Sequence, residues 1–136
     1  MVKVILGLKG SGKTKTIIDL VKKAAEEEHG SVVCIEKGYD LTYDIPHSVR
    51  LVPVTDYSFG TYEFIKGFLS GMHAGNYDIT HIFIDGLAKA VSEPMDFQLE
   101  KFLDWCESFS ERENVKFTVS VSIDEDAASE GIKKYI

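Results

Sequence analysis

Arginine, cysteine and long apolar runs are all scarce in this chain of 136 residues. Its two arginines are Arg50 and Arg112, although arginine is the usual side chain for clamping a transferring phosphate. Its two cysteines, Cys34 and Cys106, stand far apart and match no metal-binding or redox spacing, so we expect both to be buried and unreactive. No apolar run approaches the roughly 18 residues that would span a bilayer. We therefore expect a reduced, cytoplasmic protein without membrane insertion.

Positive charge is in the minority as well. The formal net charge is −7, which gives no general attraction to nucleic-acid phosphates or anionic lipids. The four histidines are scattered without ligand spacing, so a zinc site is not expected. Hydrophobic residues make up 44% of the chain and charged residues 27%, the balance of an ordinary globular protein. The length suits one domain with a hydrophobic core, so we treat residues 1–136 as a single domain. Because the net charge is negative, we expect no nucleic-acid partner.

Short β-branched runs alternate with segments of helical periodicity. The pattern predicts strands over 2–6, 31–35, 49–54, 80–84 and 116–123. It predicts a helix over 13–28, a second that begins at 61 and ends near Gly75-Asn76, and a third along the apolar stripe Met95, Leu99, Phe102, Cys106 and Phe109. The last dozen residues are weakly patterned and receive no element. Strands that alternate with helices predict an α/β fold, here a three-layer α-β-α sandwich around a mostly parallel sheet of about five strands.

The most specific motif is a glycine-rich segment at residues 7–14. It reads Gly-Leu-Lys-Gly-Ser-Gly-Lys-Thr and fits the pattern G-x-x-x-x-G-K-[ST] at every fixed position. It follows a predicted strand and opens a predicted helix, which is the context that this phosphate-binding pattern requires. Its glycines let the backbone turn tightly and aim N–H groups inward, while the helix N-terminus adds unpaired donors. Lys13 would contact the β- and γ-phosphates, and Thr14 would offer its hydroxyl to Mg²⁺.

The nucleotide-contacting residues predicted from this motif are Gly7, Leu8, Lys9, Gly10, Ser11, Gly12, Lys13, Thr14 and Lys15. A second element is the apolar strand that ends in Asp85. By itself, an aspartate at a strand end is usually a turn residue. Together with the glycine-rich segment, it is predicted to hold Mg²⁺ with Thr14, through the water shell of the ion. Lys89 and Arg50 are further candidate phosphate contacts.

On these residues the chain resembles the P-loop NTPases, and the resemblance covers most of its length. Within them it is most similar to the RecA-like (ASCE-type) group, as a minimal stand-alone ATP-binding domain. The resemblance implies that another strand lies between the two motif strands, and that a catalytic glutamate ends the strand after the first helix. That position is Glu36, whose carboxylate could deprotonate the water that attacks the γ-phosphate. The alternative is a loop glutamate that pairs with a lysine.

The chain also departs from the patterns of this superfamily. Gly86, Leu87 and Ala88 follow Asp85, so no glutamate comes directly after that aspartate. Lys9 sits one place later than the additional lysine of dimerising P-loop ATPases, and we interpret it as an exposed loop lysine. The chain is too short to hold the accessory domains of helicases, motors or transport ATPases.

Three hypotheses for the function follow. The first is a small ATP-binding protein with slow Mg²⁺-dependent ATPase activity, in which Lys13 contacts phosphate and Glu36 activates water. Turnover should be slow because a missing arginine finger costs on the order of 10³–10⁵ in rate. The second is a nucleotide-dependent regulatory or interaction module without significant hydrolysis. The third is a small-molecule kinase, which ranks lower because the chain offers no arginine-bearing lid. No N-K-x-D segment is present, which removes one usual guanine signature without establishing adenine, and ATP is taken as the default nucleotide. A protein partner or homo-oligomer stays open.

Overall fold

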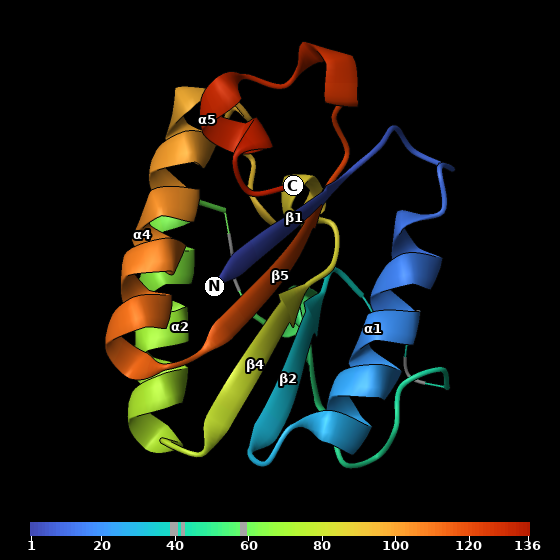
Figure 1. Ribbon diagram of the computed structural model, residues 1–136, viewed down its shortest axis with the longest axis vertical. Coiled ribbons are helices and arrows are strands. Elements are labelled where there is room, and N and C mark those ends of the chain that lie inside the picture. Colours follow the sequence, from blue (N-terminus) through green and yellow to red (C-terminus); the bar gives the residue numbers. More distant parts are fainter. Residues whose placement is uncertain (39–40, 42, 58–59) are drawn as a thin grey trace.

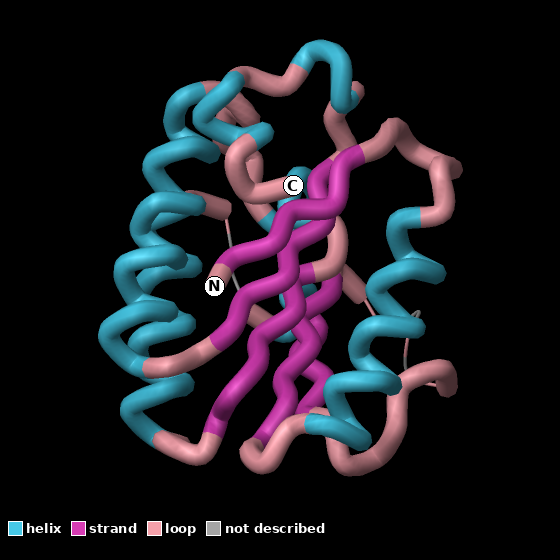
Figure 2. The backbone as a smooth tube through the Cα atoms, in the orientation of Figure 1, coloured by secondary structure: helices cyan, strands magenta, loops and turns pink. Residues whose placement is uncertain are grey.

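The computed structural model describes residues 1–38, 41, 43–57 and 60–136. At its centre lies a parallel sheet of five strands in the order β1-β5-β4-β2-β3 (Figure 1 and Figure 2). The strands are β1 (Val2–Leu6), β2 (Ser31–Glu36), β3 (Arg50–Pro53), β4 (Ile79–Ile84) and β5 (Lys116–Val121). The predicted α/β fold with a five-stranded, parallel sheet is therefore confirmed.

Helices cover both faces of this sheet. Those described are α1 (Lys13–Glu27), α2 (Tyr62–Gly75), α3 (Leu87–Ala90), α4 (Phe97–Glu113) and α5 (Glu130–Lys133), with 3₁₀ turns over Val54–Asp56 and Glu125–Ala127. Helix α1 lies on one face, whereas α2 and α4 lie together on the other (Figure 1). This arrangement is consistent with the three-layer sandwich expected from the sequence.

The larger hydrophobic core fills the space between the sheet and helices α2 and α4. The predicted stripe on α4 faces it, because Leu99, Phe102 and Cys106 are fully buried. A smaller apolar cluster lies under α1, where Ile17 and Val21 pack with residues of β2 and β4. Burial of these two apolar surfaces holds the strands so that all their carboxyl ends meet at one edge of the sheet.

Several boundaries differ from the sequence prediction. Glu36 is the last residue of β2 rather than the first of a loop, and β5 ends at Val121 rather than at Ile123. The strand β3 includes Pro53, which the ladder tolerates because β3 is an edge strand. The short helices α3 and α5 were not predicted, because four residues are too few to show a helical period.

Two expectations about scarce features can be checked in the same structure. Cys34 and Cys106 are both free and buried, and burial raises the pKa of each thiol. This confirms that both are buried. Among the described residues, no helix is long and apolar enough to cross a membrane.

Candidate functional site

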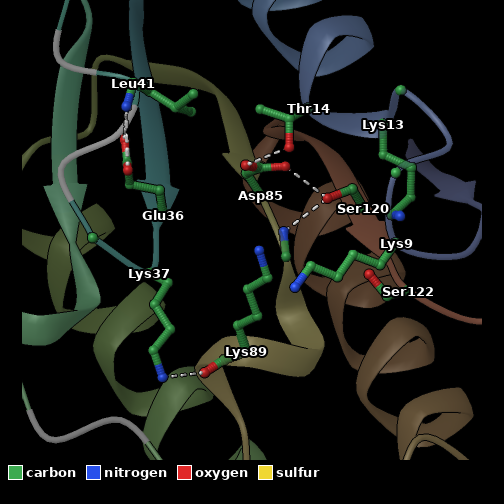
Figure 3. A pocket seen from close by; sticks show the side chains of 14 residues that line it. Lys9, Lys13, Thr14, Glu36, Lys37, Leu41, Asp85, Lys89, Ser120 and Ser122 are labelled. Atoms are coloured by element: carbon green, nitrogen blue, oxygen red, sulfur yellow. Dashed lines mark hydrogen bonds between the residues drawn. The ribbon is translucent and has the colours of Figure 1, made fainter.

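A cleft of about 350 Å³ opens beyond the carboxyl ends of the strands (Figure 3). It lies where the glycine-rich segment, the ends of β2, β4 and β5, and helix α3 come together. The lining residues are Lys9, Gly10, Gly12, Lys13, Thr14, Glu36, Lys37, Gly38, Leu41, Asp85, Gly86, Lys89, Ser120 and Ser122. Ligands of open parallel sheets bind at this edge, so this cleft is the candidate site.

The glycine-rich segment forms the tight connection between β1 and α1. Gly12 precedes α1 with φ of 91°, a left-handed conformation that side chains other than glycine rarely adopt. Gly7 has φ of 154°, and a Cβ atom there would lie 2.3 Å from Oγ of Ser11. The loop therefore requires glycine at both positions, for a conformational reason at one and for close packing at the other.

Lys13 begins α1 and reaches back over the loop. Its Nζ donates a hydrogen bond to the backbone carbonyl of Leu8 at 3.0 Å. Burial lowers the pKa of Lys13, Lys89 lowers it further, and Asp85 partly opposes both effects. The ammonium of Lys13 is thus partly dehydrated, and the charges of Asp85 and Lys89 act on it in opposite directions.

Asp85 is held by contacts from two other elements. Thr14 Oγ1 donates to Asp85 Oδ2 at 3.4 Å, and Ser120 Oγ donates to Asp85 Oδ1 at 2.9 Å. The backbone N–H of Gly86 in turn donates to Ser120 Oγ at 2.7 Å. Figure 3 shows these side chains converging from α1, β4 and β5. Ser120 is fully buried, so its hydroxyl orients the Asp85 carboxylate from the interior side. The other carboxylate oxygen, Oδ2, then faces Thr14.

Glu36 reaches the same cleft from the end of β2. It is only 3% exposed, and the backbone N–H of Leu41 lies 3.3 Å and 3.2 Å from its two carboxylate oxygens. Figure 3 shows this side chain turned toward Leu41. The backbone of the neighbouring β4 follows the same edge, since Asp85 N donates to Ile35 O at 2.8 Å. Glu36 therefore lies beside the Asp85 region and also anchors the segment that follows β2.

The cleft is positively charged although the chain is acidic. Its charged lining residues are four lysines and two carboxylates: Lys9, Lys13, Lys37, Lys89, Glu36 and Asp85. These groups leave a formal charge of +2 at the cleft, against −7 for the whole chain. A local excess of cations at a glycine-rich turn and a helix N-terminus is suited to binding an anion.

The structure brings most of the predicted site residues together. Lys9, Gly10, Gly12, Lys13, Thr14, Glu36 and Asp85 all line the cleft. The predicted contacts that do not line it are Gly7, Leu8, Ser11 and Lys15. Lys89 is also present, whereas Arg50 lies on β3 and lines a different hollow with residues 45–51. In the described part of the chain, no group of three or more His, Cys, Asp or Glu residues could hold a metal ion.

Sequence reasoning missed Lys37, Ser120 and Ser122. A signal for the two serines was present, because the polar residues Thr118 and Ser120 alternate with apolar residues along β5, and Ser122 continues the same spacing just beyond the strand. No comparable pattern in the sequence indicated Lys37. Its Nζ donates to the backbone carbonyl of Lys89 at 3.2 Å, a contact between distant parts of the chain.

Comparison with protein-family models gives no match, and no curated protein sequence matches the chain. The function must therefore be argued from the geometry and chemistry of the cleft.

Proposed function

We propose that this chain is a P-loop NTPase domain of the RecA-like type that binds ATP with Mg²⁺ in the cleft and hydrolyses it slowly. The observation that carries the proposal is the convergence of the glycine-rich loop and Lys13 with Thr14 and Asp85. These last two residues are 71 positions apart in the sequence, yet their side-chain oxygens are 3.4 Å apart. A glycine-rich turn without a phosphate-binding role does not require a carboxylate from another strand beside it.

The charge of the cleft fits a magnesium–triphosphate complex. ATP with one bound Mg²⁺ keeps a charge of about −2 at neutral pH, which complements the formal +2 of the lining residues. The backbone N–H groups of the loop and the first turn of α1 add donors that suit phosphate oxygens. The corresponding diphosphate complex carries one negative charge fewer and would leave part of the lysine charge unpaired.

The oxygen atoms at the base of the cleft also fit Mg²⁺. Thr14 Oγ1 and Asp85 Oδ2 lie 3.4 Å apart. The hydroxyl of Thr14 would bind Mg²⁺, and the carboxylate of Asp85 would hold the ion through its water shell. The hydrogen bond from Ser120 orients the carboxylate, as outer-shell partners of metal ligands commonly do. When bound there, Mg²⁺ would neutralise charge that develops on the phosphates.

The strand order supports the RecA-like form of the proposal. The strand β5 lies between β1, which precedes the glycine-rich loop, and β4, which ends at Asp85. The strand β2 pairs with β4 on its other side and ends in Glu36. The proposed phosphate-binding, metal-binding and water-activating groups therefore follow or end β1, β4 and β2, at one edge of the sheet.

In the proposed reaction, Glu36 takes a proton from water as the water oxygen bonds to the γ-phosphorus. The bond from that phosphorus to the β–γ bridging oxygen breaks, and the products are ADP and inorganic phosphate. Lys13 holds the phosphates during this displacement, and the cleft has no arginine among its described lining residues. Slow turnover is expected for that reason.

One observation favours the second candidate, a nucleotide-dependent interaction module without significant hydrolysis. The carboxylate of Glu36 already accepts from the backbone of Leu41. In this reading Glu36 organises the segment after β2, and binding of the nucleotide alters that segment. The two candidates share the nucleotide site and differ in the role of one carboxylate.

Calorimetric titration with ATP, GTP and their diphosphates, with and without Mg²⁺, tests the site. We expect Mg²⁺-dependent ATP binding that Lys13→Ala abolishes and that Lys23→Ala, the loss of an exposed lysine on α1 away from the cleft, leaves unchanged. Absence of nucleotide binding by the unaltered chain would contradict the proposal.

Phosphate release by Glu36→Gln separates the two candidates. Glutamine keeps an oxygen that can accept from Leu41 but cannot take a proton from water. A water-activating role predicts that ATP still binds while turnover falls by about 10²-fold or more. Absence of turnover by the unaltered chain favours the interaction module, whereas turnover that Glu36→Gln leaves unchanged contradicts a water-activating role for Glu36.

A further inference from the structure

We propose that Lys89, together with Lys9 on the opposite wall, clamps the terminal phosphate of the bound nucleotide and makes the cleft select triphosphate over diphosphate. The clamp rests on the proposed nucleotide site and adds to it the group that recognises the third phosphate. It also assigns to two lysines of this chain a contact that an arginine commonly makes.

Lys89 is placed by the turn that follows the metal-side carboxylate. Gly86 adopts a left-handed conformation with φ of 72° and starts the short helix α3. The side chain of Lys89 passes over Gly86, where its Cδ would lie 3.5 Å from an added Cβ atom. The backbone of Lys89 is tied to the end of β2, because Lys37 Nζ donates to its carbonyl oxygen. These contacts direct the ammonium of Lys89 into the cleft.

Lys9 enters the same cleft from the glycine-rich loop. Figure 3 shows the side chains of Lys9 and Lys89 extending from opposite sides into the space next to Asp85 and Ser120. Lys9 is exposed on the loop, as the sequence predicts, and it also lines the cleft.

The electrostatics of these lysines point to an anion between them. Within the described residues, no salt bridge involves Lys9, Lys13 or Lys89. Lys89 is close enough to Lys13 to lower its pKa. Ammonium groups that converge without a salt-bridge partner repel one another, and each of them attracts a multiply charged anion that enters the cleft.

The arginines of the chain do not offer the same contact. Arg50 lies on the edge strand β3 and lines the hollow formed with residues 45–51. Arg112 lies near the end of α4, where it pairs with Glu113 and stacks over Phe109. The cationic side chains that line the cleft are therefore lysines, and all of them belong to the described part of one chain.

The test compares the affinities of Mg²⁺–ATP and Mg²⁺–ADP for four variants by calorimetry. Lys89→Ala should weaken ATP binding by about 10-fold or more, as expected for loss of a charged hydrogen bond, and weaken ADP binding by less than about 3-fold. Lys9→Ala should change the ratio of the two affinities in the same direction. Lys89→Arg should preserve most of the ratio because it keeps the charge, and Lys23→Ala is the control for loss of one distant charge.

Equal weakening of both nucleotides by Lys89→Ala would overturn the clamp, because it would indicate a general electrostatic field. An unchanged ratio would overturn it as well. If ATP binds and Lys13→Ala abolishes binding in the same series, the nucleotide site stands and only the clamp fails. If the unaltered chain binds neither nucleotide, the proposed function and the clamp fail together.

Discussion

The two faces of the sheet differ in what they bury. The face toward α2 and α4 is packed with apolar side chains such as Ile35, Phe102 and Phe117. The face toward α1 also buries polar groups that continue to the cleft. There, His81 stacks on Phe83 with ring centroids 4.0 Å apart and hydrogen-bonds Thr118 at 2.8 Å. Two residues further along β5, on the same face, Ser120 donates to Asp85.

This difference has a physical reason. Dense apolar packing supplies most of the favourable free energy of a fold, whereas each buried polar group needs a partner to offset its lost hydration. The α2–α4 face can therefore stabilise the sheet without contributing polar groups to the candidate site. The α1 face accepts weaker apolar packing and positions polar groups behind the loop, Asp85 and Glu36. Three predictions test this comparison, beginning with the largest effect.

Removing a large side chain from the apolar face should cost the most. Phe102 on α4 is fully buried, and Phe102→Ala is expected to lower the free energy of unfolding by about 3–5 kcal/mol because it leaves a cavity. Chemical denaturation measures this change. The control is Phe97→Ala on the same helix, where the ring is 55% exposed and a change within about 0.5 kcal/mol is expected. Similar losses for both variants would contradict the assignment of the core to this face.

Titration of His81 should make the polar face sensitive to acid. Burial lowers the pKa of His81 from 6.5 to about 4; Glu28 opposes this shift, and Lys116 and the N-terminal amine reinforce it. Between pH 6.5 and 4, the unfolded chain binds this proton and the folded chain does not. The contribution of His81 is thus complete above pH 6.5 and falls, by at most about 3 kcal/mol, as the pH drops to 4.

The measurement is the free energy of unfolding between pH 4 and 7.5 for the unaltered chain and for His81→Gln. The difference between their slopes isolates this residue from the carboxylates that titrate in the same window. His47→Gln, at an exposed histidine, is the matched control. A slope that stays the same in His81→Gln would show that the buried imidazole does not titrate as expected.

The smallest effect on stability is expected at Ser120, which links the polar face to the site. Ser120→Ala leaves Asp85 Oδ1 and the Gly86 N–H without this partner, so unfolding should become easier by about 1–2 kcal/mol. If the proposed Mg²⁺ site is correct, Mg²⁺-dependent ATP affinity should fall by about 10-fold, because Asp85 loses its orientation. Calorimetry and denaturation measure the two effects. Ser108→Ala, at an exposed position on α4, should change neither.

The sequence by itself was sufficient for features that depend on neighbours along the chain. The β-branched runs predicted all five strands, and the apolar stripe predicted α4, because period and propensity are local properties. The glycine-rich segment was recognised because its spacing follows directly from the backbone geometry of a strand, a tight turn and a helix. Asp85 was identified through its place at the end of an apolar strand.

Only the tertiary structure decided which distant groups meet. The pairing of Asp85 with Ser120 depends on β5 lying next to β4, and Glu36 accepts from the backbone of Leu41, which no sequence pattern indicated. The convergence of Lys9 and Lys89 depends on the turn at Gly86 and on the tie from Lys37. A local pattern cannot encode such contacts, because they follow from strand order and from side-chain packing across the sheet. The sequence thus determined the elements and the loop, and the fold assembled the cleft.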